Sequence, residues 1–359
     1  MKKILFYINS ICYGGAERVI VNLANMFSEN GYKVILVTSF FEQEEYQLSG
    51  NVKRISLETQ KSFKSFIKRN LYRTKMLRKI CKRERPEIVV SFMAEANFRA
   101  IISTRGLNIK TAISIRNDPV KEYPNWLFKL TAKLLYPMSD GIIFQTTDAQ
   151  KWFSKRIQSK SKIILNQVDQ KFYDTNFVGE RKNIVSVGRL EKQKNYELLI
   201  KAFNLIESKV PNEELLIYGN GTEKNQLSKL INDLGLNKRV KLMGTSLDIQ
   251  EKIKNAKLFV LSSDYEGLPN VVMESMALGI PVISTDCPCG GPNMIINNGE
   301  NGILVSVNNV KELANAMLST LTKNGLLDYL SKNEKEYAEK FKPNVIYKQW
   351  EEYLAKIAN

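Results

Sequence analysis

The sequence predicts an α/β protein of two Rossmann-like, doubly wound domains that face each other across a cleft. The chain has 359 residues, more than one hydrophobic core usually fills, so two domains are expected. Short runs rich in valine and isoleucine alternate with longer helical patterns, which is typical of βαβ units and parallel sheets. The order strand, glycine-containing turn, helix begins near the N-terminus and begins again near residue 183. In such sheets, ligands bind at the carboxyl ends of the strands.

Each half of the chain supplies six expected strands. In the first half these are residues 3–8, 33–38, 88–92, 111–115, 141–144 and 162–165. In the second half they are residues 183–187, 214–218, 240–242, 258–261, 281–284 and 303–305. The polar stretch 169–182 has no clear period and marks the boundary between the expected domains 1–172 and 173–342. Residues 343–359 predict a final helix with Tyr347, Trp350, Leu354 and Ile357 on one face, and this pattern leaves open which domain the helix joins.

Composition excludes several classes of protein. Hydrophobic residues make up 43% of the chain and charged residues 25%, which excludes a largely disordered protein. No apolar run approaches the roughly 18 residues of a membrane span, and the N-terminal run is too short for a secretory signal. The chain has no histidine, so histidine-based triads, metal sites and general bases are excluded. Four cysteines in so long a chain form no disulfide framework, which favours a reduced, cytoplasmic location.

The positive charge is concentrated in the first half. Residues 1–175 contain 30 Lys and Arg against 15 Asp and Glu, a difference of +15, whereas residues 176–359 contain 23 against 22, a difference of +1. Segments 61–85 and 121–136 place apolar residues at helical spacing between cations, which is typical of helices on an anionic membrane surface. The alternative is two ordinary amphipathic helices whose apolar stripes pack on the sheet. Both interpretations hold together if the stripes face the core and the cations face lipid.

A basic nucleic-acid-binding protein is another explanation of the charge. However, no zinc, helix-turn-helix or RNA-binding signature accompanies the basic segments. This function would also leave the two glutamates described below, Glu266 and Glu274, without a role. We therefore expect no nucleic-acid partner.

A glycine turn follows the first strand of each half. Gly14 and Gly15 precede an apolar helix, where the backbone can approach a ligand closely and the helix N-terminus favours an anion such as phosphate. The simpler explanation is a tight turn. In the second half, Gly188 is followed by Arg189 and Lys194, two cations that bind phosphate oxygens well. The alternative here is a solvated surface loop.

Residues 263–281 form the most informative segment. A strand leads into a loop that contains Glu266, and a helix is expected to begin near Asn270, a suitable N-cap residue. This arrangement leaves the N–H groups of Val271 and Val272 directed into the cleft. Glu274 follows on an otherwise apolar helix, so its carboxylate is expected to be buried and to need a partner such as the hydroxyls of a ligand. The alternative is two solvated glutamates on an ordinary helix.

In these segments the chain resembles the retaining, nucleotide-sugar-dependent glycosyltransferases of the GT-B fold. The resemblance is to the family-four type, which is found in bacterial capsule, O-antigen and N-linked glycan assembly. The matching segments occur in the family's order and spacing over nearly the whole chain. They are Gly14-Gly15-Ala16-Glu17-Arg18, Gly188-Arg189 with Lys194, Glu266 with Glu274, and Gly279-Ile280-Pro281-Val282-Ile283. In the family the last helix returns to the first domain, which implies the same for residues 343–359.

The resemblance also implies roles for single residues. Glu266 hydrogen-bonds the donor sugar, while Arg189 and Lys194 neutralise the donor diphosphate. The residues that the resemblance places around the rest of the donor are Gly14 and Gly15 at the diphosphate, the amides of Asn270, Val271 and Val272 at sugar and phosphate, Glu274 at the ribose hydroxyls, and Gly219, Met243 and Thr245 beside the nucleotide and its base.

The chemistry of this set is consistent with glycosyl transfer. Cations and helix N-termini can stabilise a departing nucleoside diphosphate, and the chain has no convincing Asp-x-Asp motif, so neither a metal nor a cofactor is expected. A covalent intermediate would need a second carboxylate about 5 Å from the acid, and no candidate nucleophile is found. We therefore expect a same-face mechanism in which the leaving phosphate helps to deprotonate the acceptor.

One position departs from the family. Many relatives carry a histidine after the fourth strand of the first domain, and this chain has Arg116 and Asn117 there. Either side chain could donate a hydrogen bond to the donor sugar or phosphate, but neither duplicates a titrating imidazole.

The expected function is transfer of a hexose or N-acetylhexosamine from a nucleotide sugar, by family habit a UDP sugar, to a lipid-linked oligosaccharide in surface polysaccharide synthesis. The expected location is cytoplasmic, peripheral on the inner face of the cytoplasmic membrane. The alternative within the same fold is a nucleotide-sugar epimerase, although such enzymes generally use histidines and additional carboxylates that cannot be placed in this chain.

Overall fold

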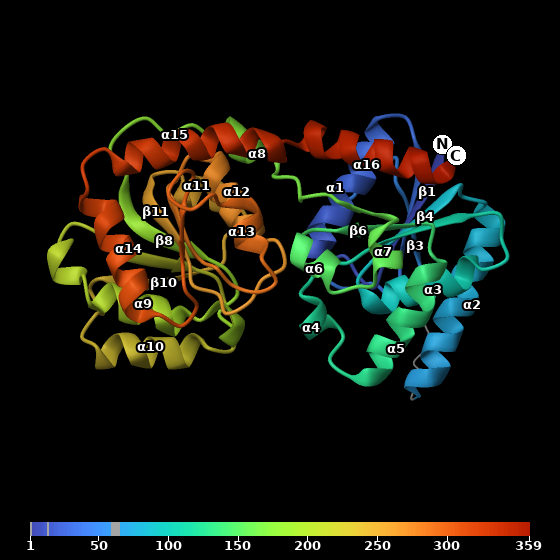
Figure 1. Ribbon diagram of the computed structural model, residues 1–359, viewed down its shortest axis with the longest axis horizontal. Helices are drawn as coiled ribbons and strands as arrows, with labels where there is room; N and C mark the ends of the chain where they lie inside the picture. Colours follow the sequence, from blue (N-terminus) through green and yellow to red (C-terminus); the bar gives the residue numbers. More distant parts are fainter. Residues whose placement is uncertain (1, 13, 59–64) are drawn as a thin grey trace. The chain divides into compact units, whose positions relative to one another are not determined.

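The computed structural model describes residues 2–12, 14–58 and 65–359, which form two compact units (Figure 1). The first unit contains Met1–Gln167 and Asn344–Asn359, and the second contains Val168–Pro343. This division lies ahead of the expected boundary after residue 172. The difference arises because the Val168 N–H donates to the Phe341 carbonyl at 2.9 Å and the Tyr173 hydroxyl donates to the Ala338 carbonyl at 2.7 Å. These bonds tie the start of the linker to the end of the second unit.

The first unit is built on a seven-stranded parallel sheet with the order β3-β2-β1-β4-β5-β6-β7. Its strands are β1 (Lys3–Ile8), β2 (Lys33–Thr38), β3 (Lys53–Ser56), β4 (Ile88–Phe92), β5 (Lys110–Ser114), β6 (Gly141–Phe144) and β7 (Ser161–Ile163). Strand β3 is not among the strands expected from the sequence. This edge strand reads Lys-Arg-Ile-Ser and is only partly buried, so it lacks the apolar run that revealed the others.

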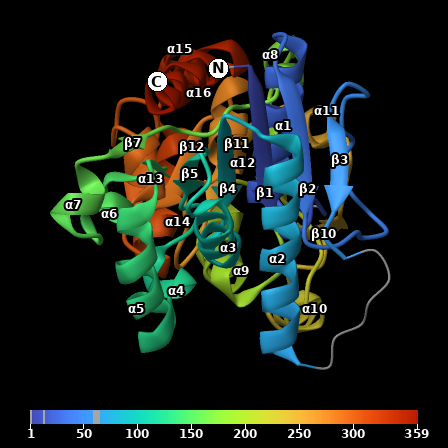
Figure 2. The same cartoon turned by 90° about the vertical axis from the view of Figure 1, so that its right-hand side faces the viewer.

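Alternate residues of β1 show how helices cover both faces of this sheet. Ile4, Phe6 and Ile8 pack with helices α1 (Gly15–Glu29) and α16 (Pro343–Ala358). Leu5 and Tyr7 pack with α2 (Phe66–Glu84) and α3 (Ala94–Thr104) on the opposite face (Figure 2). The other helices of the unit are α4 (Pro119–Glu122), α5 (Trp126–Leu135), the 3₁₀ helix η1 (Tyr136–Met138), α6 (Thr147–Lys151) and α7 (Lys155–Gln158).

The C-terminal helix α16 packs on the first unit. Trp350 is fully buried and stacks on Phe92, with ring centroids 5.8 Å apart. The Tyr353 hydroxyl donates to the Lys160 carbonyl at 2.6 Å. The face predicted from the sequence is therefore the face that this helix buries.

The apolar stripes of the two basic segments do not all face the core, so that expectation is wrong in part. In α2, Leu77 and Ile80 are buried, but the first turns expose their apolar side chains: Phe66 by 58%, Ile67 by 69% and Leu71 by 66%. In α5 only Ala132 is buried. This helix packs on α3 and η1 rather than on a strand, which leaves Trp126, Leu127, Leu130 and Leu134 exposed by 73%, 56%, 42% and 62%.

Residues 61–64 of the first basic segment lie outside the described residues. Among the described ones, no helix has the length and apolar character needed to cross a membrane.

The second unit has a six-stranded parallel sheet with the order β10-β9-β8-β11-β12-β13. Its strands are β8 (Lys182–Val187), β9 (Leu215–Tyr218), β10 (Val240–Gly244), β11 (Ala256–Leu261), β12 (Val282–Thr285) and β13 (Ile303–Val305). Its helices are α8 (Gln170–Asp174), η2 (Lys192–Lys194), α9 (Tyr196–Asn204), η3 (Glu207–Lys209), α10 (Lys224–Asp233), α11 (Ile249–Ile253), α12 (Asn270–Ala277), α13 (Gly291–Ile295), α14 (Val310–Thr322), α15 (Leu326–Ala338) and η4 (Glu339–Phe341).

The core of the second unit positions its loops. Helices α9, α10 and α14 pack against β8, β9 and β11, and α12 packs against α15 and the strands β11 and β12. In both sheets the strand order reverses beside the first strand, between β1 and β4 and between β8 and β11. The carboxyl ends of strands at such a reversal are where doubly wound sheets bind their ligands.

Candidate active site

Three glycines bring backbone segments close together at the carboxyl edge of β8, β9 and β10. Gly219 has φ +147°, and a Cβ there would lie 1.8 Å from the Gly188 carbonyl oxygen, so no larger residue fits. The Gly219 N–H donates to the Gly244 carbonyl at 2.8 Å. Met243 and Thr245 flank Gly244 and are exposed. The structure thus places the two segments predicted to flank the nucleotide next to each other.

Lys194 and Glu266 form an ion pair at the same edge. Lys194 Nζ lies 2.5 Å from Glu266 Oε1, and the Ser263 hydroxyl donates to the same oxygen at 2.7 Å. Both charged side chains are largely buried, with 14% of Lys194 and 9% of Glu266 exposed. Removing one partner of such a pair leaves a buried charge uncompensated, which is costly. Glu266 is therefore a carboxylate held in place by a neighbouring cation.

The loops that carry this pair are fastened to each other. The Asp264 N–H donates to the Gln193 carbonyl at 2.8 Å, and the Gln193 side chain donates to the Tyr265 carbonyl at 2.8 Å. The Asn195 amide donates to Asp264 Oδ1 at 2.7 Å. These bonds join the loop after β8 to the loop after β11 on both sides of the ion pair. The arrangement is preorganised, as electrostatic catalysis requires.

Arg189 differs from Lys194 although both follow β8. Its side chain is exposed and makes no hydrogen bond or ion pair with the described residues. Its guanidinium is therefore available to an anion at the carboxyl edge of the sheet, whereas the ammonium of Lys194 already faces Glu266. Burial within a ligand complex would strengthen both interactions.

Helix α12 begins differently from the expectation. Pro269, in an extended conformation, is the N-cap residue, and Asn270 is the first helical residue, so the prediction of Asn270 as the N-cap is wrong. The Val272 N–H donates to the Pro269 carbonyl at 3.1 Å and is not directed at a ligand as predicted. For the Val271 N–H, no hydrogen-bond acceptor is found in the part of the chain that is described. An asparagine at this position offered a side-chain cap, but the preceding proline already fixes the entry of the chain.

Glu274 lies on α12 and is only 4% exposed, as the apolar character of this helix predicted. Its role at the ribose stays a prediction. Among the described residues, no group of three His, Cys, Asp or Glu side chains is placed to hold a metal ion.

The predicted residues of the first unit lie at the carboxyl edge of its own sheet. Gly14 is the N-cap of α1 and Gly15 its first residue, as the turn predicted. A Cβ on Gly14 would lie 2.3 Å from a carboxylate oxygen of Glu17, so this turn also packs closely on the helix it precedes. Their role at a diphosphate stays a prediction.

Arg116 is turned into the protein. It is 7% exposed, donates to Asn166 Oδ1, and lies over the Phe92 ring with its guanidinium carbon 4.6 Å from the ring centroid. Burial lowers the pKa of Arg116 to about 9. Its Nε is buried and has no hydrogen-bond partner among the described residues. Asn117 accepts the Asp118 N–H at 2.9 Å. Contact of either residue with a donor stays a prediction.

Glu122 is a buried carboxylate that was not among the predicted site residues. Its Oε1 accepts the Ala94 N–H at the start of α3 at 2.7 Å, and its Oε2 is buried with no partner among the described residues. Burial raises the pKa of Glu122 to about 7. The only available signal was an acidic residue shortly after the Arg116 loop, and it lay inside a segment interpreted as a basic surface helix.

Comparison with known proteins identifies the family. A family model described as Glycosyltransferase Family 4 matches residues 13–172, and a model described as Glycosyl transferases group 1 matches residues 167–337. Together the two models span residues 13–337, which is most of both units. The chain belongs to the family-four glycosyltransferases of the GT-B fold.

Several relatives are similar to the chain along most of its length. An alpha-1,4-N-acetyl-D-galactosaminyltransferase of Campylobacter jejuni, whose name includes a PP-undecaprenol-linked glycan, is 27% identical over 368 residues, covering 100% of each chain. An uncharacterized glycosyltransferase of Methanocaldococcus jannaschii is 34% identical over 245 residues, a match that spans 61% of this chain and 60% of the archaeal protein. The structure of Anabaena HepE in complex with UDP has a TM-score of 0.82 at 18% identity, covering 99% of this chain and 100% of HepE. At that identity the likeness shows the fold.

Proposed function

We propose that the protein transfers a hexose or N-acetylhexosamine from a UDP-linked donor to a lipid-linked oligosaccharide, with retention of configuration, in bacterial surface polysaccharide synthesis. The observation that carries the proposal is the arrangement of Arg189, Lys194 and Glu266 at the carboxyl edge of the second unit's sheet. Two cations and one fixed carboxylate suit a ligand that combines a diphosphate with a sugar.

The donor belongs to the second unit in this proposal. The exposed guanidinium of Arg189 donates hydrogen bonds to diphosphate oxygens, and Lys194 adds a second positive charge beside them. Glu266 accepts hydrogen bonds from sugar hydroxyls, and the buried Glu274 accepts those of the ribose. The complex of Anabaena HepE with UDP supports a uridine carrier, because HepE has the same fold.

The reaction proceeds on one face of the sugar. The bond between the anomeric carbon and the diphosphate oxygen breaks, the acceptor oxygen bonds to the same carbon, and the acceptor proton passes to the departing diphosphate. Arg189 and Lys194 stabilise the negative charge that develops on the leaving group without a metal ion. Glu266 Oε1 already accepts bonds from Lys194 and Ser263, which fits a group that orients hydroxyls better than it fits a nucleophile.

The acceptor belongs to the first unit. Residues 1–167 and 344–359 contain 31 Lys and Arg against 15 Asp and Glu, a difference of +16, whereas residues 168–343 contain 22 of each and are neutral. The whole net charge therefore lies on one unit, which also exposes apolar residues of α2 and α5. This combination favours peripheral binding to an anionic membrane on its cytoplasmic face, where a lipid-linked acceptor is found. The Campylobacter jejuni relative named for a PP-undecaprenol-linked glycan supports this acceptor class.

The experiment is a transfer assay with the full chain. Radiolabelled UDP-hexoses and UDP-N-acetylhexosamines are incubated with a glycan linked to diphospho-undecaprenol, and the extended lipid is detected after extraction. We expect one donor to label the lipid, with the anomeric configuration of the donor kept in the product by NMR. An inverted linkage would overturn retention, and no labelled lipid with any donor would overturn the transfer. Conversion of a free nucleotide sugar without acceptor would favour an epimerase instead.

A further inference from the structure

The first unit contains an apolar groove of about 320 Å³ between its outer helices. Helix α3 packs against both α2 and α5, so α3 forms the floor and the other two helices form the walls. Seven of the twelve lining residues are apolar, and Ile67, Leu71, Ile102 and Leu127 expose 69%, 66%, 47% and 56% of their surface. Single exposed apolar residues are common, but a continuous apolar trough of this kind marks a binding surface.

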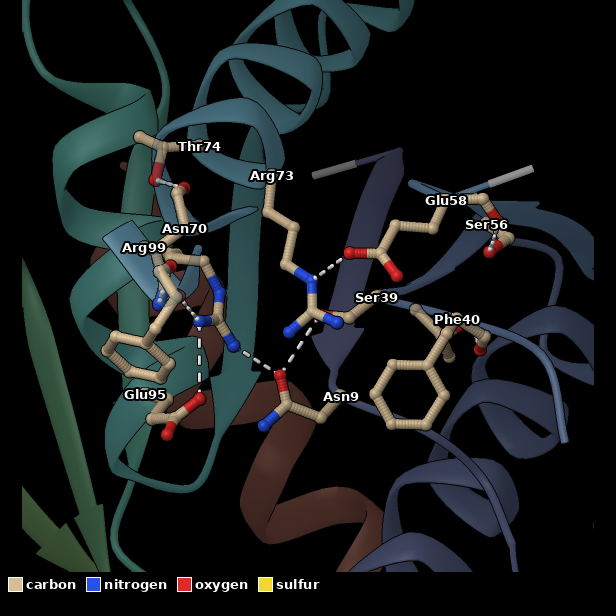
Figure 3. Close-up of polar contacts among 12 residues, drawn as sticks. Asn9, Ser39, Phe40, Ser56, Glu58, Asn70, Arg73, Thr74, Glu95 and Arg99 are labelled. Carbon is tan, nitrogen blue, oxygen red and sulfur yellow. Dashed lines mark hydrogen bonds and ion pairs between the residues drawn. The ribbon is translucent and has the colours of Figure 1, made fainter. Parts of the chain in front are cut away.

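One end of the groove is polar. Asn70, Thr74, Glu95 and Arg99 line it, and Figure 3 shows how they lie. Arg99 is 4% exposed and donates to Asn70 Oδ1 at 2.6 Å, to the Tyr7 hydroxyl at 2.8 Å and to Asn9 Oδ1. Arg99 also pairs with Glu95 at 3.4 Å, so its guanidinium is held at the groove end by α2, α3 and the turn after β1, and its charge is compensated there.

A second guanidinium lies beside this polar end. Arg73 is 5% exposed and donates through Nε to Glu58 Oε1 at 2.7 Å. Its guanidinium carbon lies 5.3 Å from the centre of the Phe40 ring. Its two terminal nitrogens have no hydrogen-bond partner among the described residues, and Figure 3 shows them beside Asn9, Ser39 and Phe40. A largely buried cation with unused donors fits an anionic or polar group of a ligand.

We infer that this groove binds the polyisoprenoid chain of the lipid-linked acceptor and that the diphosphate of the acceptor meets Arg73. The inference rests on the acceptor class of the proposed function and assigns it a place. A ligand with a long hydrocarbon chain and an anionic head matches a groove that is apolar along its walls and has the unused guanidinium donors of Arg73 beside its polar end. Helix α2, which forms one wall, carries eight Lys and Arg against Glu84 alone, which adds charge complementarity.

Other occupants fit the groove less well. A protein segment would bring backbone N–H and carbonyl groups against Phe, Ile and Leu walls that offer no hydrogen bonds, which is unfavourable. A flat bilayer surface would meet the outward side chains of α5, such as Trp126 and Leu134, rather than Ile102 on the floor of the groove. A single hydrocarbon chain needs no hydrogen bonds and follows a trough.

The test is binding of farnesyl diphosphate to the full chain, measured by equilibrium dialysis below the concentration at which this lipid forms micelles. We expect it to bind at least tenfold more tightly than inorganic diphosphate, a difference of about 1.4 kcal/mol. Leu127→Asp, on the groove wall, is expected to weaken farnesyl diphosphate binding at least tenfold. The matched control is Leu134→Asp, because Leu134 lies on the same helix, is similarly exposed at 62% against 56%, and does not line the groove.

Each outcome decides the inference. A loss confined to Leu127→Asp supports the groove, whereas equal losses in both variants would indicate a general membrane-binding face and overturn it. Equal affinity of the wild-type protein for farnesyl diphosphate and inorganic diphosphate would also overturn it. Arg73→Gln is expected to weaken binding of farnesyl diphosphate, because it removes the head-group contact, whereas inorganic diphosphate can also bind at Arg189 and Lys194 of the second unit. Unchanged binding of farnesyl diphosphate by Arg73→Gln would overturn the contact with Arg73. The assay contains no sugar donor, so failure of glycosyl transfer would leave this result unaffected, and the two proposals can fail separately.

Discussion

The two units of this protein share one architecture and use it in opposite ways. Each is a parallel sheet between helices, with polar residues at the carboxyl ends of its strands. The second unit is neutral, and hydrogen bonds join the two sequence-distant loops that carry its predicted site residues Lys194 and Glu266. The first unit carries the entire charge of +16, 31 cations against 15 anions, and exposes apolar side chains on α2 and α5. The comparison shows that a doubly wound unit can be specialised through its loops or through its outer helices.

Removing Lys194 should have the largest effect and would test the claim that the second unit is a preorganised site. Lys194→Ala is expected to lower kcat by about 100-fold or more, as loss of a charge-stabilising donor typically does. It should also lower the free energy of unfolding by about 3–5 kcal/mol, because Glu266 is left buried without its cation. Initial rates and urea unfolding measure the two effects.

The control for Lys194→Ala is Lys201→Ala. Lys201 also pairs with a glutamate at 2.5 Å, but both partners are 46% exposed. An exposed pair contributes at most about 1 kcal/mol, so this variant should keep both activity and stability. If Lys194→Ala behaved like this control, the ion pair with Glu266 would have neither the structural nor the catalytic role assigned to it.

Arg189→Ala should reduce transfer without unfolding the protein, which separates binding from stability within the second unit. The exposed guanidinium makes no ion pair with the described residues, so its loss is expected to change the free energy of unfolding by no more than about 0.5 kcal/mol. We expect kcat/KM for the donor to fall at least tenfold, about 1.4 kcal/mol. Arg189→Lys keeps the charge but loses the bidentate hydrogen bonds to phosphate, so its kcat/KM should lie between those of the wild type and Arg189→Ala. Unchanged kcat/KM in Arg189→Ala would remove this residue from the site.

Glu122 offers a test within the first unit through pH. Burial raises its pKa from 4.5 to about 7 in the folded protein. Between these two values the unfolded chain has released the proton and the folded chain still binds it, so folding becomes less favourable as pH rises. Wild-type stability should therefore fall between about pH 4.5 and 7 relative to Glu122→Gln and level off above that range. Urea unfolding across pH measures the difference, and the exposed Glu42→Gln is the control. Parallel curves for wild type and Glu122→Gln would contradict the raised pKa.

The sequence predicted the fold because burial leaves a strong pattern. Twelve of the thirteen strands appear as apolar runs, and the missing one, β3, is a short charged edge strand whose sequence has no such run. The buried position of Glu274 followed from the apolar helix around it. The predicted N-cap of α12 was wrong by one residue. Pro269 and Asn270 both favour a helix entry at this point, and in the structure Pro269 is the N-cap.

Contacts between distant residues were beyond the reach of the sequence. The pair Lys194 and Glu266 joins residues 72 positions apart, and only the reversal of strand order beside β8 brings their loops together. The exposed stripes of α2 and α5 were missed for another reason. Helical periodicity shows which face of a helix is apolar, but it does not show whether another element covers that face.

The smallest predicted effect concerns single lysines and sharpens the comparison between the units most directly. Lys75, Lys79 and Lys82 on α2 are exposed, and a cation near an anionic surface contributes about 1 kcal/mol to membrane binding. Each Lys→Gln variant should therefore weaken co-sedimentation with phosphatidylglycerol-containing vesicles about fivefold at low salt, and the difference should shrink as salt screens the charges. Lys224→Gln changes a lysine that is also exposed, on α10 of the neutral unit, and this variant should bind like the wild type. Equal weakening by Lys224→Gln would mean that the membrane senses only the total charge, and the division of charge between the units would then have no consequence for where the protein binds.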